Sequence, residues 1–413
     1  MFIPFFKFHN FYFFYCKFNC IRNFKYLLVL ACLSLFIVIV ANQPRSVTKN
    51  DAMIHCNITN IMSFNDMDPY LEENIKKVYP ANFPVKIEKI GTNYLPLVIK
   101  SLKLFCHPYI NWIENYKYFL AMIPTLFILF NFKNNNNNNL TGFAVVLMGF
   151  NGLYQALRSG NISIIAQLLL LVFFISLLKK KVVFSSFLFS LVVYIKITVL
   201  PIYVFLLFAL KNKEIKKFLI SSSSFLTFLL FITYLLEKEI FVTWIKYYNI
   251  FSSSENINNF NVLNDTFGNY YDTPSVPNLL FYLYNSNLIL FFLVSSVVLL
   301  IIFSTIREIS NIKEDTLDVF MNTFILYFLI NPYIRTYHLV EIAIFLAFYI
   351  KNKNVKSHFL IIFLCLIPQI TLLEIGFEII ESYSTVLISL YPPILLLLFI
   401  LTEKIKVNNN TDS

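Results

Sequence analysis

Long apolar blocks dominate this sequence and constrain its fold more than any other feature. The chain has 413 residues, of which 58% are hydrophobic and 14% are charged. The apolar residues gather in blocks of roughly 15–25, which as helices are long enough to cross about 30 Å of hydrocarbon. Soluble domains carry about 25% charged residues, so this charge density is too low to cover a water-soluble fold. The sequence therefore predicts an integral membrane protein.

The spans should be helical, because lipid offers no hydrogen-bond partner to an exposed backbone group. A membrane β-barrel needs alternating segments of about 10 residues, and the sequence shows none. We predict an all-α polytopic membrane protein with a bundle of about 12 transmembrane helices. The expected spans are 26–41, 118–132, 140–157, 162–178, 182–195, 197–210, 218–236, 278–303, 317–331, 338–350, 357–373 and 385–401.

The polar stretches between these blocks predict the domain organisation. Residues 1–25 form an expected cytoplasmic segment, and residues 26–413 form an expected single transmembrane domain. The first helix is expected to be a retained signal anchor, with a cleaved signal peptide as the alternative. Residues 42–116 carry many charges and predict a long first extracytoplasmic loop. Within it Tyr94–Phe105 is apolar but broken by two lysines, which predicts an interfacial or re-entrant helix.

Basic residues fall on alternate connections between the expected spans. The net charge of +10 comes largely from lysine clusters such as 179–181 and 211–217. The expected short outer connections contain only Arg158, Lys196 and Arg335. This asymmetry follows the positive-inside rule and places the N-terminus in the cytoplasm. The membrane explains the basic clusters, so we expect no nucleic-acid partner.

Six cysteines are present, and none forms a CxxC pair. Cys56 and Cys106 fall in the same expected outer loop and could form a disulfide. Without a dense cysteine framework, the sequence favours unpaired thiols. The histidines and cysteines also lack a recognisable zinc-binding spacing.

Ionisable and polar residues gather at the expected outer ends of the helices. They are Asp51 and Asp68 in the first loop, Arg158 and Asn161 in a short turn, Lys196 before Pro201, and Arg335 and His338 in the 331–338 turn, with Glu341 one helical turn further on. Ionisable groups at membrane depth usually face a cavity or a partner. Converging cations favour an anionic ligand, and a phosphate at the bilayer surface fits them best. An acid in the same cavity could remove a proton from a hydroxyl.

Each of these residues also has an ordinary structural explanation. Lys196 and Arg335 could anchor the helices at the interface, and Arg158 could serve the turn that contains Gly160. His338 could be a cap or a packing residue. Asp51 could be a solvated aspartate, and Asp68 could belong to a chance DxD in a loop rich in Asn and Asp. The joint pattern, more than any member, supports a site.

An ordered set of short motifs at these positions resembles the family-87 GT-C glycosyltransferases, the polyprenyl-phosphate-mannose-dependent type. The motifs are Asn50-Asp51, Asp68-Pro69-Tyr70, Asn93-Tyr94-Leu95-Pro96-Leu97, Gly160-Asn161, Lys196 with Pro201, and Asn331-Pro332 with Tyr337-His338. The resemblance extends over roughly residues 25–350, since its order and spacing are kept there. The sequence departs from the family pattern with Gly-Asn for Gly-Gln, Leu-Pro for Pro-Pro and one histidine in place of two.

The resemblance implies a GT-C-type bundle that transfers a hexose, with mannose as the first candidate. The donor would be a polyprenyl-phosphate-linked sugar and the acceptor a lipid or a glycan, with inversion at the extracytoplasmic face. Asp51 would be the general base. The residues implied for the donor phosphate or the substrate are Arg158, Asn161, Lys196, Arg335, His338, Asp68 and Tyr70.

The resemblance implies no cofactor besides the lipid-linked donor, and the need for a divalent metal stays open. It implies a prokaryotic plasma membrane, with the endoplasmic reticulum as the alternative. The competing function is a multi-span transporter or lipid flippase without glycosyl transfer. Transporters often contain two repeated halves, and no internal repeat is evident in this sequence.

Overall fold

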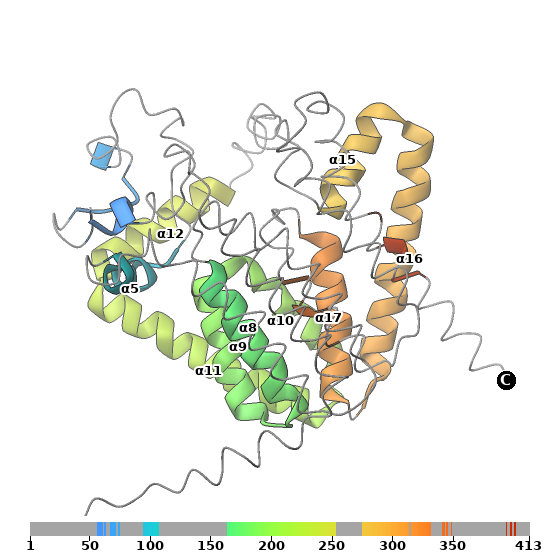
Figure 1. Ribbon diagram of the computed structural model, residues 1–413, viewed down its shortest axis with the longest axis horizontal. Coiled ribbons are helices and arrows are strands. Elements are labelled where there is room, and N and C mark those ends of the chain that lie inside the picture. Colours follow the sequence, from blue (N-terminus) through green and yellow to red (C-terminus); the bar gives the residue numbers. More distant parts are fainter. Residues whose placement is uncertain are drawn as a thin grey trace, which may run out of the picture. The chain divides into compact units, whose positions relative to one another are not determined.

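A computed structural model of the chain is shown in Figure 1. It describes residues 56–60, 62, 67–71, 73–74, 94–106, 163–252, 275–313 and 315–331, and the separate positions 341, 342, 344, 345, 348, 394, 397, 398, 400 and 401. The chain divides into two compact units, Met1–Pro44 and Arg45–Ser413, and every described residue belongs to the second.

The elements of this described part are all helical, with no strand among them. The α-helices are α5 (Pro96–Cys106), α8 (Ser163–Leu178), α9 (Val182–Ile195), α10 (Pro201–Leu206), α11 (Lys213–Leu236), α12 (Lys238–Ser252), α15 (Val276–Ser286), α16 (Leu288–Asn311) and α17 (Thr316–Ile330), and the 3-10 helices are η3 (Ile197–Val199) and η4 (Leu207–Ala209). The predicted helical class is confirmed for these residues, whereas the number of spans stays a prediction.

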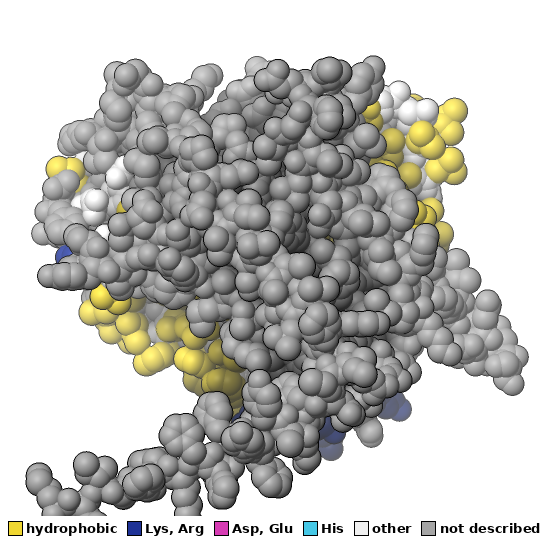
Figure 2. Space-filling model, in the orientation of Figure 1, with side chains coloured by type: hydrophobic (Ala, Val, Ile, Leu, Met, Phe, Trp, Pro, Cys, Tyr) yellow, Lys and Arg dark blue, Asp and Glu magenta, His cyan; other side chains and the backbone are white. Residues whose placement is uncertain are grey.

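Two helices, α11 and α16, are long and apolar enough to cross a membrane. Each has 24 residues, which corresponds to about 36 Å of helix. Large apolar side chains on both are exposed, including Phe228 and Leu236 on α11 and Ile289 and Phe303 on α16. Figure 2 shows such side chains over α11 and over α15 and α16. Exposed apolar surface of this extent is unlike a helix in a soluble core and indicates a membrane setting.

Serine side chains join α8, α9 and α11, which pack side by side in Figure 1. Ser176 and Ser185 share a hydrogen bond of 2.6 Å between α8 and α9. Between α9 and α11, Ser186 donates to the Phe218 carbonyl and Ser190 donates to the Ser222 carbonyl. Small polar residues let helices approach closely and bond across lipid-embedded interfaces.

The two serine bonds also fix the direction of α11 relative to α9. Both join residues that are 32 apart in sequence, and a constant offset requires the two helices to run parallel. The exposed lysines 179–181 precede α9, and the exposed lysines 211 and 213 precede or begin α11. These two basic clusters therefore lie at the same end, as the predicted alternation requires.

Helix α17 is the most deeply buried helix of the described part. Residues 317 and 319–329 are all buried, and aromatic rings surround it. The Phe320 ring lies 4.7 Å from the Phe218 ring and 5.1 Å from the Phe173 ring, centroid to centroid. Phe324 lies 5.1 Å from Phe174. The two Phe320 pairs are edge-to-face, an arrangement that adds about 1 kcal/mol each beyond burial. This core therefore ties α8, α11 and α17 together.

Two predicted spans are interrupted in the structure. The span predicted over 197–210 is divided into η3, α10 and η4, because Pro201 lacks a backbone N–H and begins a new helix. The span predicted over 278–303 is divided into α15 and α16. The Asn287 side chain accepts a hydrogen bond from the Leu290 N–H and caps α16, an arrangement that starts a helix rather than continues one.

Helix α5 agrees with the short helix that was predicted over Tyr94–Phe105. Its 11 residues give about 16 Å of helix, too short to cross a bilayer. Helix α12 follows α11 after Glu237 and was not predicted. The predicted spans 26–41, 118–132, 140–157 and 357–373 lie outside the described residues, as do most of 338–350 and 385–401.

Candidate functional site

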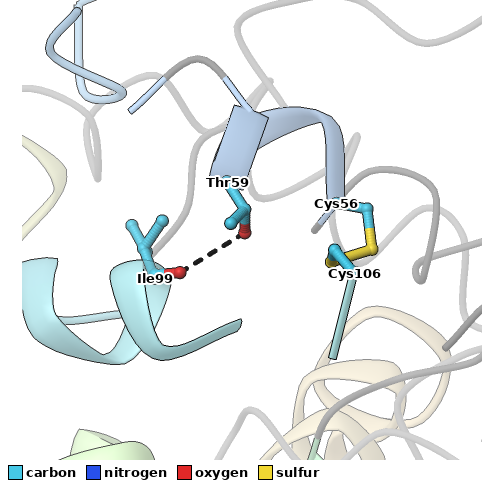
Figure 3. Close-up of a disulfide and its surroundings, with 4 residues drawn as sticks. All are labelled: Cys56, Thr59, Ile99 and Cys106. Atoms are coloured by element: carbon cyan, nitrogen blue, oxygen red, sulfur yellow. Dashed lines mark hydrogen bonds between the residues drawn. A yellow bond between two sulfur atoms is a disulfide. The ribbon is translucent and has the colours of Figure 1, made fainter. Parts of the chain in front are cut away.

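A disulfide joins two helical pieces of the predicted first loop. Cys56 and Cys106 are bonded with their Cα atoms 5.4 Å apart, and Figure 3 shows the pair. The expectation of unpaired thiols is therefore wrong for these two residues. Sequence spacing says little about which cysteines meet in space, and here the fold brings together two residues 50 apart. Thr59 reinforces the connection by donating to the Ile99 carbonyl at 3.4 Å.

Asp68 and Tyr70, two residues implied for the substrate site, are held in the same loop. The Asp68 carboxylate accepts a hydrogen bond from the Tyr70 N–H at 2.9 Å. The Tyr70 hydroxyl donates to the Tyr94 carbonyl at 2.5 Å, and the Tyr70 side chain is buried. The Asn74 amide donates to the Asp68 carbonyl at 3.0 Å. These bonds stabilise the loop, and a contact of either residue with a donor stays a prediction.

The disulfide-bonded loop packs on the ends of three helices. Ile58, Met62, Tyr70 and Val98 form a buried cluster with Tyr194 of α9 and Trp244 of α12, and the residues packed against it include Ile195, Ile197, Leu230 and Phe241. Lys100 of α5 also pairs with Glu237, which ends α11. The loop therefore lies at the helix ends opposite the lysines that precede α9 and α11.

Lys196 occupies the break between α9 and η3. Its backbone N–H donates to the Val192 carbonyl and ends α9, while its carbonyl accepts from Val199 at 3.1 Å. Its backbone angles, φ −131° and ψ 84°, are not helical. Irregular backbone at membrane depth is tolerated where protein or a cavity satisfies it. Lys196 thus lies at the non-helical residue between α9 and η3.

The Lys196 ammonium pairs with the carboxylate of Glu341, a residue that lies 145 positions further along the chain. Only 9% of the lysine side chain and 5% of the glutamate side chain are exposed. Lys196 therefore does not extend to the bilayer surface as an interfacial anchor would. Each buried charge loses several kcal/mol of hydration free energy. The attraction between the two groups offsets this loss, so either group would be destabilising without the other.

Polar side chains from η3 and α17 surround this ion pair. The buried Tyr327 side chain lies near Thr198 and Asn331 and within electrostatic range of Glu341. Asn331 ends α17 and is itself buried. Phe345, four residues after Glu341, packs against Phe328 with ring centroids 5.3 Å apart. Three segments of the chain thus contribute to one polar cluster, which we define as Lys196, Thr198, Tyr327, Asn331 and Glu341.

Three of the predicted site residues are described, and five are not. Lys196, Asp68 and Tyr70 lie at the same helix ends, since the hydrophobic cluster that contains Tyr70 packs against the residues on both sides of Lys196. Asp51, Arg158, Asn161, Arg335 and His338 lie outside the described residues. Glu341 and Tyr327 were not among the predicted site residues. An acid in an otherwise apolar helix was the signal for Glu341.

No group of three or more His, Cys, Asp or Glu side chains that could hold a metal ion occurs among the described residues. The cluster around Lys196 contains one carboxylate, and that carboxylate is paired with an ammonium. What the described cluster offers chemically is one buried cation together with hydroxyl and amide groups.

A comparison with known protein families gives a match over the middle of the chain. The model of glycosyltransferase family 87 matches residues 118–348, more than half of the chain. The matched region contains the whole cluster around Lys196, together with Arg158, Asn161, Arg335 and His338. It begins after the first loop, so Asp51, Asp68 and Tyr70 lie before it. None of the curated proteins and none of the solved structures matches the chain.

Proposed function

The chain belongs to glycosyltransferase family 87, and from this premise we propose that it transfers a hexose, mannose first, from a polyprenyl-phosphate donor. The acceptor is a hydroxyl of a membrane lipid or a glycan. The family decides between the two functions that the sequence left open, since it is a family of transferases and not of transporters. A donor that is itself a lipid also explains why a transferase is embedded in a membrane.

The proposed reaction is a single displacement at the anomeric carbon. The Asp51 carboxylate removes the proton from the acceptor hydroxyl, whose oxygen bonds to the anomeric carbon. The bond from that carbon to the phosphate oxygen breaks, and polyprenyl phosphate leaves with the electron pair. Because the acceptor attacks opposite the leaving group, the configuration inverts. Positive groups near the phosphate stabilise the charge that develops on it, and Lys196, Arg158, Arg335 and His338 have this role.

One observation supports this arrangement above all: the first loop packs beside Lys196. The cluster that contains Ile58, Met62 and Tyr70 includes Tyr194, and Ile195 and Ile197 pack against it. A single displacement needs a base and a phosphate-binding cation on either side of one sugar. The loop supplies acids, among them Asp51 five positions before Cys56, and the break after α9 supplies the cation.

The disulfide supports a location for the site. Disulfides persist in oxidising compartments and are rare in the cytosol, so the loop that contains Cys56 and Cys106 belongs on the non-cytosolic side. The lysines before α9 and α11 then face the cytosol, as the positive-inside rule requires. We propose transfer at the extracytoplasmic face of a prokaryotic plasma membrane, or at the lumenal face of the endoplasmic reticulum.

The test is transfer from polyprenyl-phosphate mannose by purified protein in nanodiscs, with membrane lipid extracts as acceptors. Released polyprenyl phosphate and the sugar-bearing product are measured by mass spectrometry. Replacing Asp51 with Asn should lower turnover by about 10²–10⁴-fold, the usual contribution of general acid–base catalysis. Asp66→Asn, in the same loop, is the matched control and should leave turnover unchanged.

Three outcomes contradict parts of this proposal. Turnover retained by Asp51→Asn refutes Asp51 as the base. Transfer from polyprenyl-phosphate glucose but not from the mannose donor refutes mannose as the transferred sugar. Movement of the lipid-linked sugar across the bilayer without any cleavage refutes a transferase and favours a flippase.

A further inference from the structure

Glu341 is not explained by the proposed transfer, and the structure gives it a definite place. Its carboxylate pairs with the Lys196 ammonium, and both side chains are almost completely buried. Burying two charges costs more than packing apolar side chains of the same volume. An ionisable pair at membrane depth therefore points to a function rather than to stability alone.

Both members of the pair lie next to packed or hydrogen-bonded parts of the chain. Lys196 sits between the last turn of α9 and η3, with its backbone bonded on both sides. Glu341 precedes Phe345, which packs against Phe324 and Phe328 of α17. Tyr327 of the same helix lies within electrostatic range of the Glu341 carboxylate. The ammonium and its carboxylate partner therefore lie among packed and hydrogen-bonded neighbours.

The pair has a consequence for any phosphate that binds there. A phosphodiester such as the proposed donor carries one negative charge, whereas a phosphomonoester such as the leaving group carries about two at neutral pH. A neighbouring carboxylate repels both, and it repels the more highly charged monoester more strongly. Without Glu341, an uncompensated buried Lys196 would hold the leaving group tightly.

We infer that Glu341 is a positioning residue: it fixes the Lys196 ammonium for the phosphate of the lipid-linked donor and weakens the hold of that ammonium on the departing lipid phosphate. The inference rests on the proposed function, because it needs a phosphate at Lys196. It adds to that function a reason why the product leaves. The positive charge of Lys196 stabilises the negative charge that develops on the phosphate in the transition state. The negative charge of Glu341 weakens binding of the phosphate product and so limits product inhibition.

The experiment compares wild-type protein with Glu341→Gln, which keeps the shape of the side chain and removes its charge. Donor KM, kcat and the inhibition constant of a short-chain polyprenyl phosphate are measured, with the uncharged polyprenyl alcohol as a control inhibitor. We expect the inhibition constant for the phosphate to fall about tenfold, a conservative figure for losing one nearby charge. The kcat should fall as release slows, donor KM should fall less, and inhibition by the alcohol should not change.

Two further variants separate this role from a structural one. Glu237→Gln breaks the other ion pair, in which 53% of the Lys100 side chain is exposed, and it should leave all three constants unchanged. Lys196→Met combined with Glu341→Gln removes both charges and keeps the buried region neutral. It therefore remains measurable even where Glu341→Gln alone folds poorly, and its inhibition constant for the phosphate should rise above that of the wild type.

The outcomes distinguish this inference from the proposed function. An unchanged inhibition constant in Glu341→Gln, with wild-type turnover intact, overturns the role of Glu341 and leaves the transferase standing. A loss of active protein without a change in inhibition shows a purely structural role and also overturns it. Wild-type protein that neither cleaves nor binds a polyprenyl-phosphate sugar overturns the proposed function and this inference together.

Discussion

At Lys196 the chain changes from α-helix to 3-10 helix, and the side chain at that point is a buried cation. Its charge is balanced by Glu341, so the described part of the site is close to neutral before substrate binds. A pair of this kind is weak evidence for extra stability, because its desolvation offsets its attraction. Removing one partner is a different matter, since the other is then left buried and unpaired.

This difference gives a prediction for stability at the scale of single residues. Lys196→Met should lower the free energy of unfolding by about 3 kcal/mol, because Glu341 is left as an uncompensated buried charge. Lys196→Met combined with Glu341→Gln should recover most of the loss. Thermal unfolding of the detergent-solubilised protein measures both variants.

The exposed pair provides the control for that measurement. Lys100→Met should change the free energy of unfolding by less than about 1 kcal/mol, because solvent screens an exposed ion pair. Equal losses in Lys196→Met and Lys100→Met would contradict the distinction between the buried and the exposed pair.

At the scale of elements, the helices α8, α9, α11 and α17 agree closely with the spans predicted from the sequence, because apolar composition and length suffice to predict them. The break at Lys196 was predicted between the spans 182–195 and 197–210, whereas the interruption at Asn287 was missed. One polar residue hardly changes the composition of a long apolar block, so it does not alter the prediction of a span. The same residue can still end a helix when its side chain forms hydrogen bonds with the backbone. Helix α12 was missed because it contains Lys238, Glu239 and Lys246 and does not have the composition of a span.

The sequence offered the Cys56–Cys106 disulfide only as the less favoured alternative, and the bond carries a prediction for the loop. Replacing both Cys56 and Cys106 with serine should free the two helical pieces that it joins. For cysteines that are 50 residues apart, the chain-entropy relation gives about 4 kcal/mol for that constraint. We expect faster proteolysis within residues 56–106 and a loss of sugar transfer, with the amount of membrane-inserted protein unchanged. Limited proteolysis and the transfer assay measure these effects.

Cys365→Ser is the matched control for the disulfide variant, since it removes a thiol far from this loop in sequence. Its proteolysis and transfer should equal those of the wild type. Proteolysis of the double serine variant at the wild-type rate would mean that packing on α9 and α12 alone holds the loop.

At the scale of the whole molecule, two kinds of observation agree on which end of the helices faces each side of the membrane. The parallel α9 and α11 place two lysine clusters at one end, and the loop packs at the other. Membership of glycosyltransferase family 87, predicted from the ordered motifs, is confirmed by the family match. The site roles of Asp51, Arg158 and the 331–338 turn stay predictions from resemblance. Short motifs give the order of residues along the chain, and they do not give the distances between those residues in the folded protein.

Sidedness can be tested with single cysteines in a variant that keeps only the Cys56–Cys106 pair. Cysteines at Lys180 and Lys213 should react with a membrane-impermeant maleimide only after the cells are permeabilised. A cysteine at Lys103, an exposed position of α5, should react in intact cells. Opposite labelling of Lys180 and Lys213 would contradict the parallel arrangement.

The modest length of the two segments that meet at Lys196 has a consequence for how a substrate arrives. Helix α9 has 14 residues, or about 21 Å, and the 13 residues of Ile197–Ala209 reach only about 20–26 Å. Each is shorter than the roughly 30 Å of a typical hydrocarbon layer. A molecule dissolved in water would have to shed its hydration to descend to that depth, whereas a long-chain lipid already resides there and needs only to diffuse sideways.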